Sequence, residues 1–216
     1  MTQVKTFEFN PFAENTYVVW DKTGECVVVD PGCYTEEERA LLQDFIVQNN
    51  LKPVRLVNTH CHLDHVFGNK FVADTWNLGL EIHRGELPVL AQFAQVCQMY
   101  GIPNVQPSPM PERFLEEGGA VAFGETRLEV LFTPGHSPAS ISLYCPQESF
   151  VLAGDVLFFE SIGRTDLPGG NFDTLLQSIR TKLFALPGET LVYSGHGATT
   201  TIRHEQEYNP FLQATG

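Results

Sequence analysis

The chain has 216 residues, of which 43% are hydrophobic, and its formal net charge at pH 7 is −13. This length and composition suit a folded protein with a substantial core and exclude an intrinsically disordered chain. The negative charge disfavours nucleic acid as a partner, because phosphate binding requires clustered lysine and arginine. The sequence has no apolar run of membrane-spanning length and no signal-peptide core, so we expect a cytoplasmic protein with no membrane partner.

The cysteines are odd in number, scattered along the chain, and form no C-x-x-C pair. This pattern is typical of a reducing compartment and argues against a disulfide framework or a structural zinc knuckle. No internal repeat, low-complexity tract or flexible linker interrupts the sequence. We therefore expect residues 1–216 to form a single domain.

The first half of the chain is predicted to start with strands and to continue with alternating helices and strands. The expected strands are Val4–Phe9, Asn15–Trp20, Glu25–Val29, 54–58 and Gly79–His83. The expected helices begin at Thr35 and end near Asn50, run from Gly68 to Thr75, and run from Glu86 to Tyr100. The acidic residues after Thr35 favour a helix N-terminus there.

The second half begins with a long Pro- and Gly-rich loop over 101–119, which is a candidate substrate cover together with Tyr100. Strands are expected at 120–123, 127–132, 140–145, 149–153 and 190–193, and helices at Asp173–Ala185 and 198–207. Two strand-rich halves, each accompanied by helices, indicate two sheets packed face to face with helices outside.

A cluster of metal-ligand side chains follows the predicted strand 54–58. Thr59-His60-Cys61-His62-Leu63-Asp64-His65 puts three imidazoles and a carboxylate into six consecutive positions. These groups are the ligands preferred by zinc and other borderline divalent metals. The alternative is a solvated loop that happens to be rich in histidine. A ligand-bearing loop directly after a buried strand favours a metal site.

Three more candidate ligands stand at strand ends beside glycine, where the backbone can turn sharply. They are His136 after Pro134-Gly135, Asp155 after Gly154, and His196 after Gly195. Singly, each histidine could be a turn residue, and Asp155 could cap the following segment. Together with the first cluster they supply five histidines and two aspartates. That set exceeds one four-coordinate metal and fits two metals that share a bridging carboxylate.

The pattern T-H-x-H-x-D-H, then G-H, G-D and G-H, resembles the metallo-β-lactamase fold superfamily, and most closely its small glyoxalase II-like hydrolases. The resemblance covers essentially the whole chain and implies an α/β fold, a four-layer αβ/βα sandwich with the site at one edge. It implies two zinc ions, with iron or manganese as alternatives. The implied ligands are His60, His62 and His136 for the first metal and Asp64, His65 and His196 for the second, with Asp155 bridging.

Residues around the implied ligands receive supporting roles. Asp30 and Thr59, at strand ends, are candidates to orient the ligands, although Asp30 could instead be a turn residue before Pro31. Arg164 and Asp166 resemble a G-R-[ST]-D segment of the family and are expected to form an ion pair or to contact substrate. Full-length glyoxalase II enzymes carry a further helical glutathione-binding domain, and this chain stops soon after His196.

The expected activity is hydrolysis of a small-molecule thioester, such as an S-acylglutathione-like compound, by a hydroxide bridging two metals, with Asp64 helping to orient the water. A thiolate leaves without a general acid because thiol pKa values lie near ~8.5. A mononuclear iron persulfide dioxygenase, with His60, His136 and Asp155 as ligands, is the main alternative. A lactonase with the same centre and a non-catalytic metal-binding protein are also open, as are the substrate and the oligomeric state.

Overall fold

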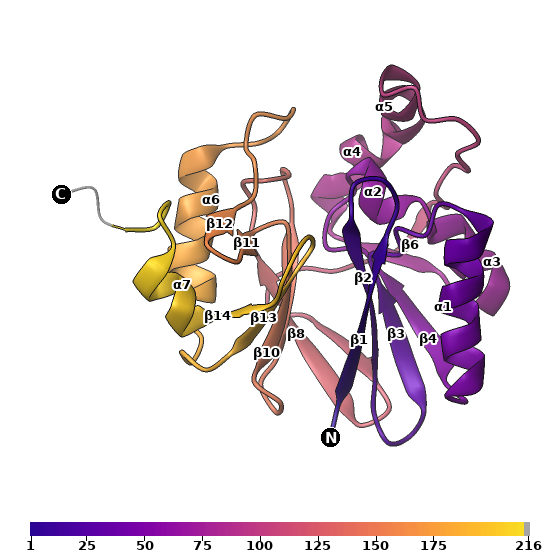
Figure 1. The fold of residues 1–216 in the computed structure, drawn as a ribbon, viewed down its shortest axis with the longest axis horizontal. Coiled ribbons are helices and arrows are strands. Elements are labelled where there is room, and N and C mark those ends of the chain that lie inside the picture. Colours follow the sequence, from indigo (N-terminus) through magenta and orange to yellow (C-terminus); the bar gives the residue numbers. More distant parts are fainter. Residues whose placement is uncertain (214–216) are drawn as a thin grey trace.

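The computed structural model of the protein describes residues 1–213. Its first sheet has six strands in the order β1-β2-β3-β4-β5-β6 (Figure 1). These strands are β1 (Gln3–Phe9), β2 (Glu14–Trp20), β3 (Glu25–Val29), β4 (Lys52–Val57), β5 (Leu80–Ile82) and β6 (Pro111–Phe114). Strands β1 to β3 are antiparallel neighbours, whereas β3 to β6 are joined in parallel pairs.

The second sheet also has six strands, in the order β14-β13-β10-β9-β8-β7. Its strands are β7 (Ala120–Phe123), β8 (Thr126–Phe132), β9 (Ile141–Cys145), β10 (Phe150–Gly154), β13 (Leu191–Ser194) and β14 (Thr200–Thr201). A separate two-stranded ribbon consists of β11 (Leu157–Phe158) and β12 (Ser161–Ile162).

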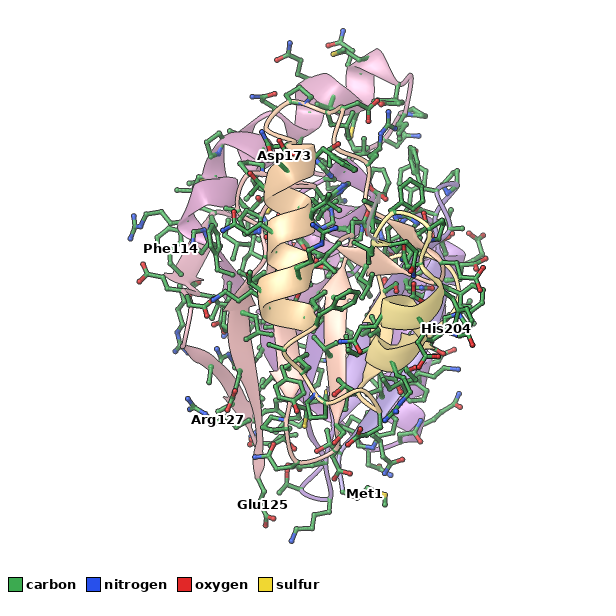
Figure 2. All side chains as sticks on the ribbon, turned by 90° about the vertical axis from the view of Figure 1, so that its left-hand side faces the viewer. Met1, Phe114, Glu125, Arg127, Asp173 and His204 are labelled. Atoms are coloured by element: carbon green, nitrogen blue, oxygen red, sulfur yellow. The ribbon has the colours of Figure 1, made fainter. Side chains whose placement is uncertain are left out.

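Helices cover the outer face of each sheet (Figure 1). The first half of the chain contributes α1 (Glu36–Gln48), α2 (Leu63–Val66), α3 (Asn69–Trp76), the 3-10 turn η1 (Arg84–Glu86), α4 (Leu87–Ala91) and α5 (Phe93–Met99). The second half contributes α6 (Phe172–Ser178), the π-helix η2 (Ile179–Leu183) and α7 (Ile202–Tyr208). Figure 2 shows α6, with Asp173 at its upper end, beside α7, which carries His204. Of residues 1–213, none lies in a helix long and apolar enough to cross a membrane.

Central strands are apolar on both faces because each lies between two layers. In β3, Cys26 and Val28 pack in the cluster beneath α1 and α3, whereas Val27 and Val29 pack between the two sheets. In β10, Leu152 packs between the sheets and Val151 packs against the α6–α7 side. Three hydrophobic clusters therefore fill the three interfaces of a four-layer αβ/βα sandwich, which confirms the predicted fold.

Several predicted boundaries agree with the structure, and α1 shows why. Thr35 is its N-cap, and a capping box joins the Thr35 side chain to the Glu38 N–H and the Glu38 side chain to the Thr35 N–H. This arrangement satisfies backbone donors that the first helical turn leaves free. The predicted helix start at Thr35 is thereby confirmed.

Three predicted segments differ from the structure. The helix expected over Glu86–Tyr100 is divided into η1, α4 and α5, because the Gln92 N–H donates to Val89 O three residues back and tightens the chain there. The expected loop 101–119 contains β6, an edge strand that begins with proline. The last helix starts later than expected, because Thr200 and Thr201 pair with β13.

Candidate metal centre

The predicted ligand residues meet at one edge of the sandwich, where β4, β10 and β13 end. After β4 the chain stays extended through His62, and α2 begins at Leu63. Asp155 directly follows β10, and His196 stands two residues after β13. Strands β10 and β13 are parallel, so their carboxyl ends coincide, as at the sites of other open α/β sheets.

Two neighbouring groups of donor atoms occupy this edge. His60, His62 and His136 form one, and Asp64, His65 and His196 form the other; within each group the donor atoms lie within 4.8 Å of one another. In the first group, His62 Nδ1 is 2.8 Å from His136 Nε2. In the second, His196 Nε2 is 3.2 Å from Asp64 Oδ2.

Asp155 contacts both groups. Its Oδ2 is 3.4 Å from His136 Nε2 and 3.5 Å from His196 Nε2, and its Oδ1 is 3.4 Å from His65 Nε2. A carboxylate in this position can donate one oxygen to each of two cations.

Buried atoms without partners point to a cation at this edge. His60 Nε2, His65 Nε2 and Asp155 Oδ1 are buried and accept or donate no hydrogen bond, although His65 Nε2 lies 3.4 Å from Asp155 Oδ1. Buried polar atoms are normally paired, so each orphaned atom requires an explanation. Divalent cations at the two groups would satisfy all three atoms, and the imidazole and carboxylate donors match the preferences of such ions.

His60 and His62 of the first group favour the neutral form that binds metal. Burial, reinforced by His136, lowers the pKa of His62 to about 3. Burial, together with the nearby His65, likewise holds the pKa of His60 well below its usual range. Neutral imidazoles offer a free lone pair to a cation near neutral pH.

The carboxylates favour their charged form. Burial acts to raise the pKa of Asp155, but the adjacent His65 outweighs it and holds that pKa well below its usual range. The pKa of Asp64 is lowered too, because His65 and a hydrogen bond with His196 outweigh burial. Both aspartates therefore carry negative charge toward the same centre.

Hydrogen bonds on the outer ring nitrogens orient the histidines. Asp30 Oδ1 accepts from the Thr59 N–H at 2.7 Å, and Thr59 Oγ1 donates to Asp30 Oδ2 at 2.6 Å. Thr59 Oγ1 in turn lies 3.1 Å from His60 Nδ1, and Asp30 Oδ2 lies 3.2 Å from His65 Nδ1. Asp30 thus fixes two imidazoles, a buried role beyond that of a turn residue.

Two other histidines donate to backbone carbonyls that the sequence did not indicate. His136 Nδ1 lies 2.8 Å from Arg164 O, and His196 Nδ1 lies 3.0 Å from Phe12 O and 3.1 Å from Ala13 O. A carbonyl acceptor fixes the proton on Nδ1 and leaves Nε2 free to bind metal. Every residue has a carbonyl, so no residue type could have marked these positions.

Glu86 was also missed by the sequence analysis. Its buried carboxylate accepts from the Cys61 N–H at 2.9 Å, from Ser137 Oγ at 2.7 and 2.8 Å, and from the Ala139 N–H at 2.9 Å. Glu86 therefore joins the loop that carries His60 to the loop that carries His136. In sequence it is indistinguishable from an acidic residue at a helix start.

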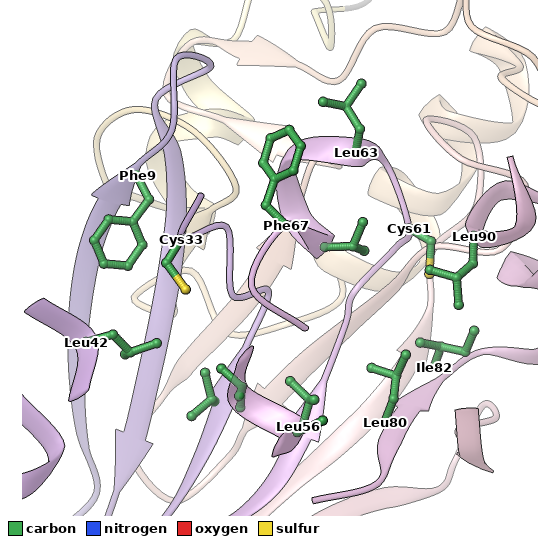
Figure 3. Packing of buried hydrophobic residues seen from close by; sticks show 14 of the residues in the cluster. Phe9, Cys33, Leu42, Leu56, Cys61, Leu63, Phe67, Leu80, Ile82 and Leu90 are labelled. Carbon is green, nitrogen blue, oxygen red and sulfur yellow. The ribbon is translucent and has the colours of Figure 1, made fainter. Parts of the chain in front are cut away.

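The remaining candidates are placed as follows. Arg164 and Asp166 form the predicted ion pair through two bonds of 2.7 Å, with both side chains largely exposed. Cys61 points into the core toward Leu90 (Figure 3). His83 accepts a hydrogen bond from the Gly85 N–H and stacks on Phe132.

The comparisons with known proteins agree with this geometry. Residues 9–196 match the family model of the metallo-beta-lactamase superfamily. A probable metallo-hydrolase of Bacillus subtilis, YqgX, is 39% identical over 203 residues, covering 94% of this chain and 93% of the relative. The hydroxyacylglutathione hydrolase GloC of Haemophilus influenzae is 35% identical over 207 residues, covering 94% of each chain.

Solved structures show the same fold. The B3 metallo-beta-lactamase BLEG-1 superposes with a TM-score of 0.89 at 35% identity, covering 98% of this chain and all of that one. TTHA1623, in a di-iron-bound form, superposes with a TM-score of 0.87 at 35% identity, covering 97% of this chain and all of that one. The fold therefore implies divalent metal ions. The chain belongs to the metallo-beta-lactamase superfamily, and this membership supports a metal-dependent hydrolase that acts on a small molecule.

Proposed function

We propose that the protein is a dinuclear metal-dependent hydrolase of thioesters. His60, His62 and His136 hold the first ion, Asp64, His65 and His196 hold the second, and Asp155 holds both. The observation that carries this proposal is the pair of adjacent donor groups with Asp155 between them and with buried, unpartnered atoms on both sides. The native metal is zinc in this proposal, with iron or manganese as the alternatives.

Two bound divalent ions would supply a water of lowered pKa and a Lewis acid for the substrate carbonyl. The chain's own residues keep the donor atoms in place: Asp30 and Thr59 fix the imidazoles, and Asp64 accepts a hydrogen bond from the attacking water. The water, after losing one proton to solvent, would add its oxygen to the carbonyl carbon, and the carbon–sulfur bond would then break. The products would be a carboxylic acid, which releases its proton to solvent, and a thiolate, which takes up a proton from solvent. A thiol has a pKa near ~8.5, so this departure needs no general acid.

Two relatives support the proposal. GloC, at 35% identity, is a hydroxyacylglutathione hydrolase, that is, a thioesterase. TTHA1623, also at 35% identity, contains two iron ions, which supports two metal positions in this chain.

The test measures metal content and hydrolysis on the same samples. We expect about two ions per chain in the protein purified without added metal. His65→Ala should keep about one ion and lose at least about 100-fold in thioester hydrolysis. His204→Ala is the matched control, because the His204 ring lies on α7 at the surface, beside Glu160 and Phe159 and outside both donor groups.

Each outcome is decisive. About two zinc ions per chain together with thioester hydrolysis would support the proposal. Hydrolysis of lactones but not of thioesters would show that the protein is a lactonase with the same centre. About one iron ion per chain, with the same content in His65→Ala, would exclude the dinuclear centre. The alternative would then be a persulfide dioxygenase, which is tested by measuring oxygen consumption with a persulfide.

A further inference from the structure

Helices α4 and α5 form an unusually uncharged part of a charged protein. The segment 87–100 contains no aspartate, glutamate, lysine or arginine, although the chain has 26 acidic and 13 basic residues. Gln92, Gln95, Met99 and Tyr100 of this segment are nevertheless exposed. Exposed helical surface normally carries charge, so the absence of charged residues over 87–100 is unusual.

A cavity of about 590 Å³ lies between these helices and the metal centre. At its inner end are the site residues His62, Asp64, His136, Asp155 and His196. On the α4–α5 side it is lined by Pro88, Val89, Gln92, Phe93, Gln95, Val96, Met99 and Tyr100. Val89, Phe93, Val96 and Tyr100 recur at helical spacing, and they therefore form one apolar wall.

The opposite wall is also poor in charge. It consists of Pro138, Leu167, Pro168 and Gly169, together with Arg164. Among the described lining residues Arg164 is the one lysine or arginine, and its guanidinium is bound by both oxygens of Asp166. A glutathione group carries two carboxylates, and this cavity offers it one cation that is already paired.

We propose that the acyl group of the substrate is apolar, aromatic or branched aliphatic, and that it packs against the α4–α5 wall. This inference rests on the proposed thioesterase function and names the substrate class for it. The thiol leaves the centre and needs an open path, which the exposed Arg164 side provides. The acyl group is therefore assigned to the wall formed by Val89, Phe93 and Val96, with Leu63 at its inner end.

A panel of thioesters tests the inference on the metal-loaded protein. Acetyl, 2-hydroxypropanoyl and 3-phenylpropanoyl groups are each joined to N-acetylcysteamine and to glutathione, and the rates are corrected for hydroxide-catalysed hydrolysis. We expect kcat/KM for the 3-phenylpropanoyl thioester to exceed that for the acetyl thioester by at least about tenfold on either thiol. Changing glutathione to the neutral thiol should alter kcat/KM by less than about threefold.

Two aspartate substitutions on α5 test whether the acyl group binds at the apolar wall. Val96→Asp puts a charge on the apolar wall, whereas Gln98→Asp puts the same charge on the same helix outside the cavity lining. Val96→Asp should remove the preference for the 3-phenylpropanoyl group over the acetyl group. Gln98→Asp should leave both rates unchanged.

Binding of the product acids separates this inference from the proposed function. In thermal melts of the metal-loaded protein, 3-phenylpropanoate should raise Tm more than acetate does, and Val96→Asp should abolish the difference. Equal kcat/KM for all acyl groups, or equal shifts for both acids, would overturn the apolar acyl site and leave thioester hydrolysis standing. No hydrolysis of any thioester, with the acids still distinguished, would overturn the proposed function and retain the apolar site.

Discussion

At the scale of single residues, Glu86 supports the metal centre without a donor atom in it. Glu86→Gln replaces one carboxylate oxygen by an NH2 group, which then faces the N–H group of either Cys61 or Ala139. A buried donor left without an acceptor costs about 1–3 kcal/mol, so we expect the free energy of unfolding to fall by that amount in urea titrations.

Metal affinity distinguishes a positioning role of Glu86 at the metal centre from a role in stability alone. We expect Glu86→Gln to weaken the first metal about tenfold in a chelator competition, because the loops that carry His60 and His136 are then less well joined. Glu37→Gln, on the exposed first turn of α1, should change neither quantity. An unchanged metal affinity in Glu86→Gln would show that Glu86 only stabilises the fold.

Gly195 is a second residue whose size matters for the centre. A Cβ on this residue would overlap Asp155 Oδ1 and lie 2.9 Å from His65 Cε1. Gly195→Ala should therefore displace the shared carboxylate and lower hydrolysis about 100-fold with loss of bound metal. Gly197→Ala meets no atom within 4 Å but has a φ of +73°, so it serves as a control for backbone strain alone.

At the scale of elements, the turn after β2 ties the two sheets together at the end opposite the metal centre. Asp21 accepts from Thr23 within this turn, and from Glu125 and Thr126 in the turn between β7 and β8. Burial acts to raise the pKa of Asp21, but these hydrogen bonds outweigh it and lower the pKa to about 2. The charged form of Asp21 is therefore bound more tightly in the folded state.

This depressed pKa predicts a dependence of stability on pH. The contribution of Asp21 is fully present above its unfolded pKa near ~4, and it is lost as pH falls toward ~2. Asp21→Asn should be less stable than the wild type by about 2 kcal/mol at pH 6, and the difference should shrink as the pH falls below ~4. Urea unfolding of the metal-free wild type and Asp21→Asn between pH 6 and pH 3 measures this difference in stability. A difference that does not change with pH would contradict the depressed pKa of Asp21.

The central elements were predictable from the sequence because burial on both faces leaves a continuous apolar run, as in β3 and β10. The edge strands β6 and β14 were not, since β6 is partly exposed and β14 is only two residues long. The metal-donor residues could be recognised because histidine and aspartate, which are metal-ligand types, stand at the ends of predicted strands. Of the supporting residues, Asp30 and Thr59 were indicated by their strand-end positions, whereas the others were not, because Arg164 and Phe12 act through carbonyls and Glu86 acts across segments distant in sequence.

At the scale of the whole molecule, the donor groups of the centre come from both halves of the chain. His60 and His65 follow the first sheet, whereas His136, Asp155 and His196 follow strands of the second. In the proposed dinuclear centre, bound metal therefore holds the two sheets together at this edge. Ligands that bind only the folded state stabilise it by about 4 kcal/mol at a thousandfold excess over Kd.

Removal of metal should accordingly lower Tm by about 10 °C in thermal melts with and without a chelator. Asp155→Asn, which weakens both metal positions, should show a much smaller change on addition of the chelator. His204→Ala should show the full wild-type change. Equal melting temperatures with and without chelator in the wild type would show that the sheets are held by their hydrophobic clusters alone.

The apolar wall lies on a segment that contributes none of the seven donor residues. Segment 87–100 meets the core through Leu90 and Cys97, while its other side, with Val89, Phe93 and Val96, faces the cavity. During divergence, substitutions on that side can therefore change which molecules are accepted without disturbing the reactive centre. In the proposed function, catalysis thus depends on residues at strand ends, whereas selectivity depends on the side chains of one short helical segment.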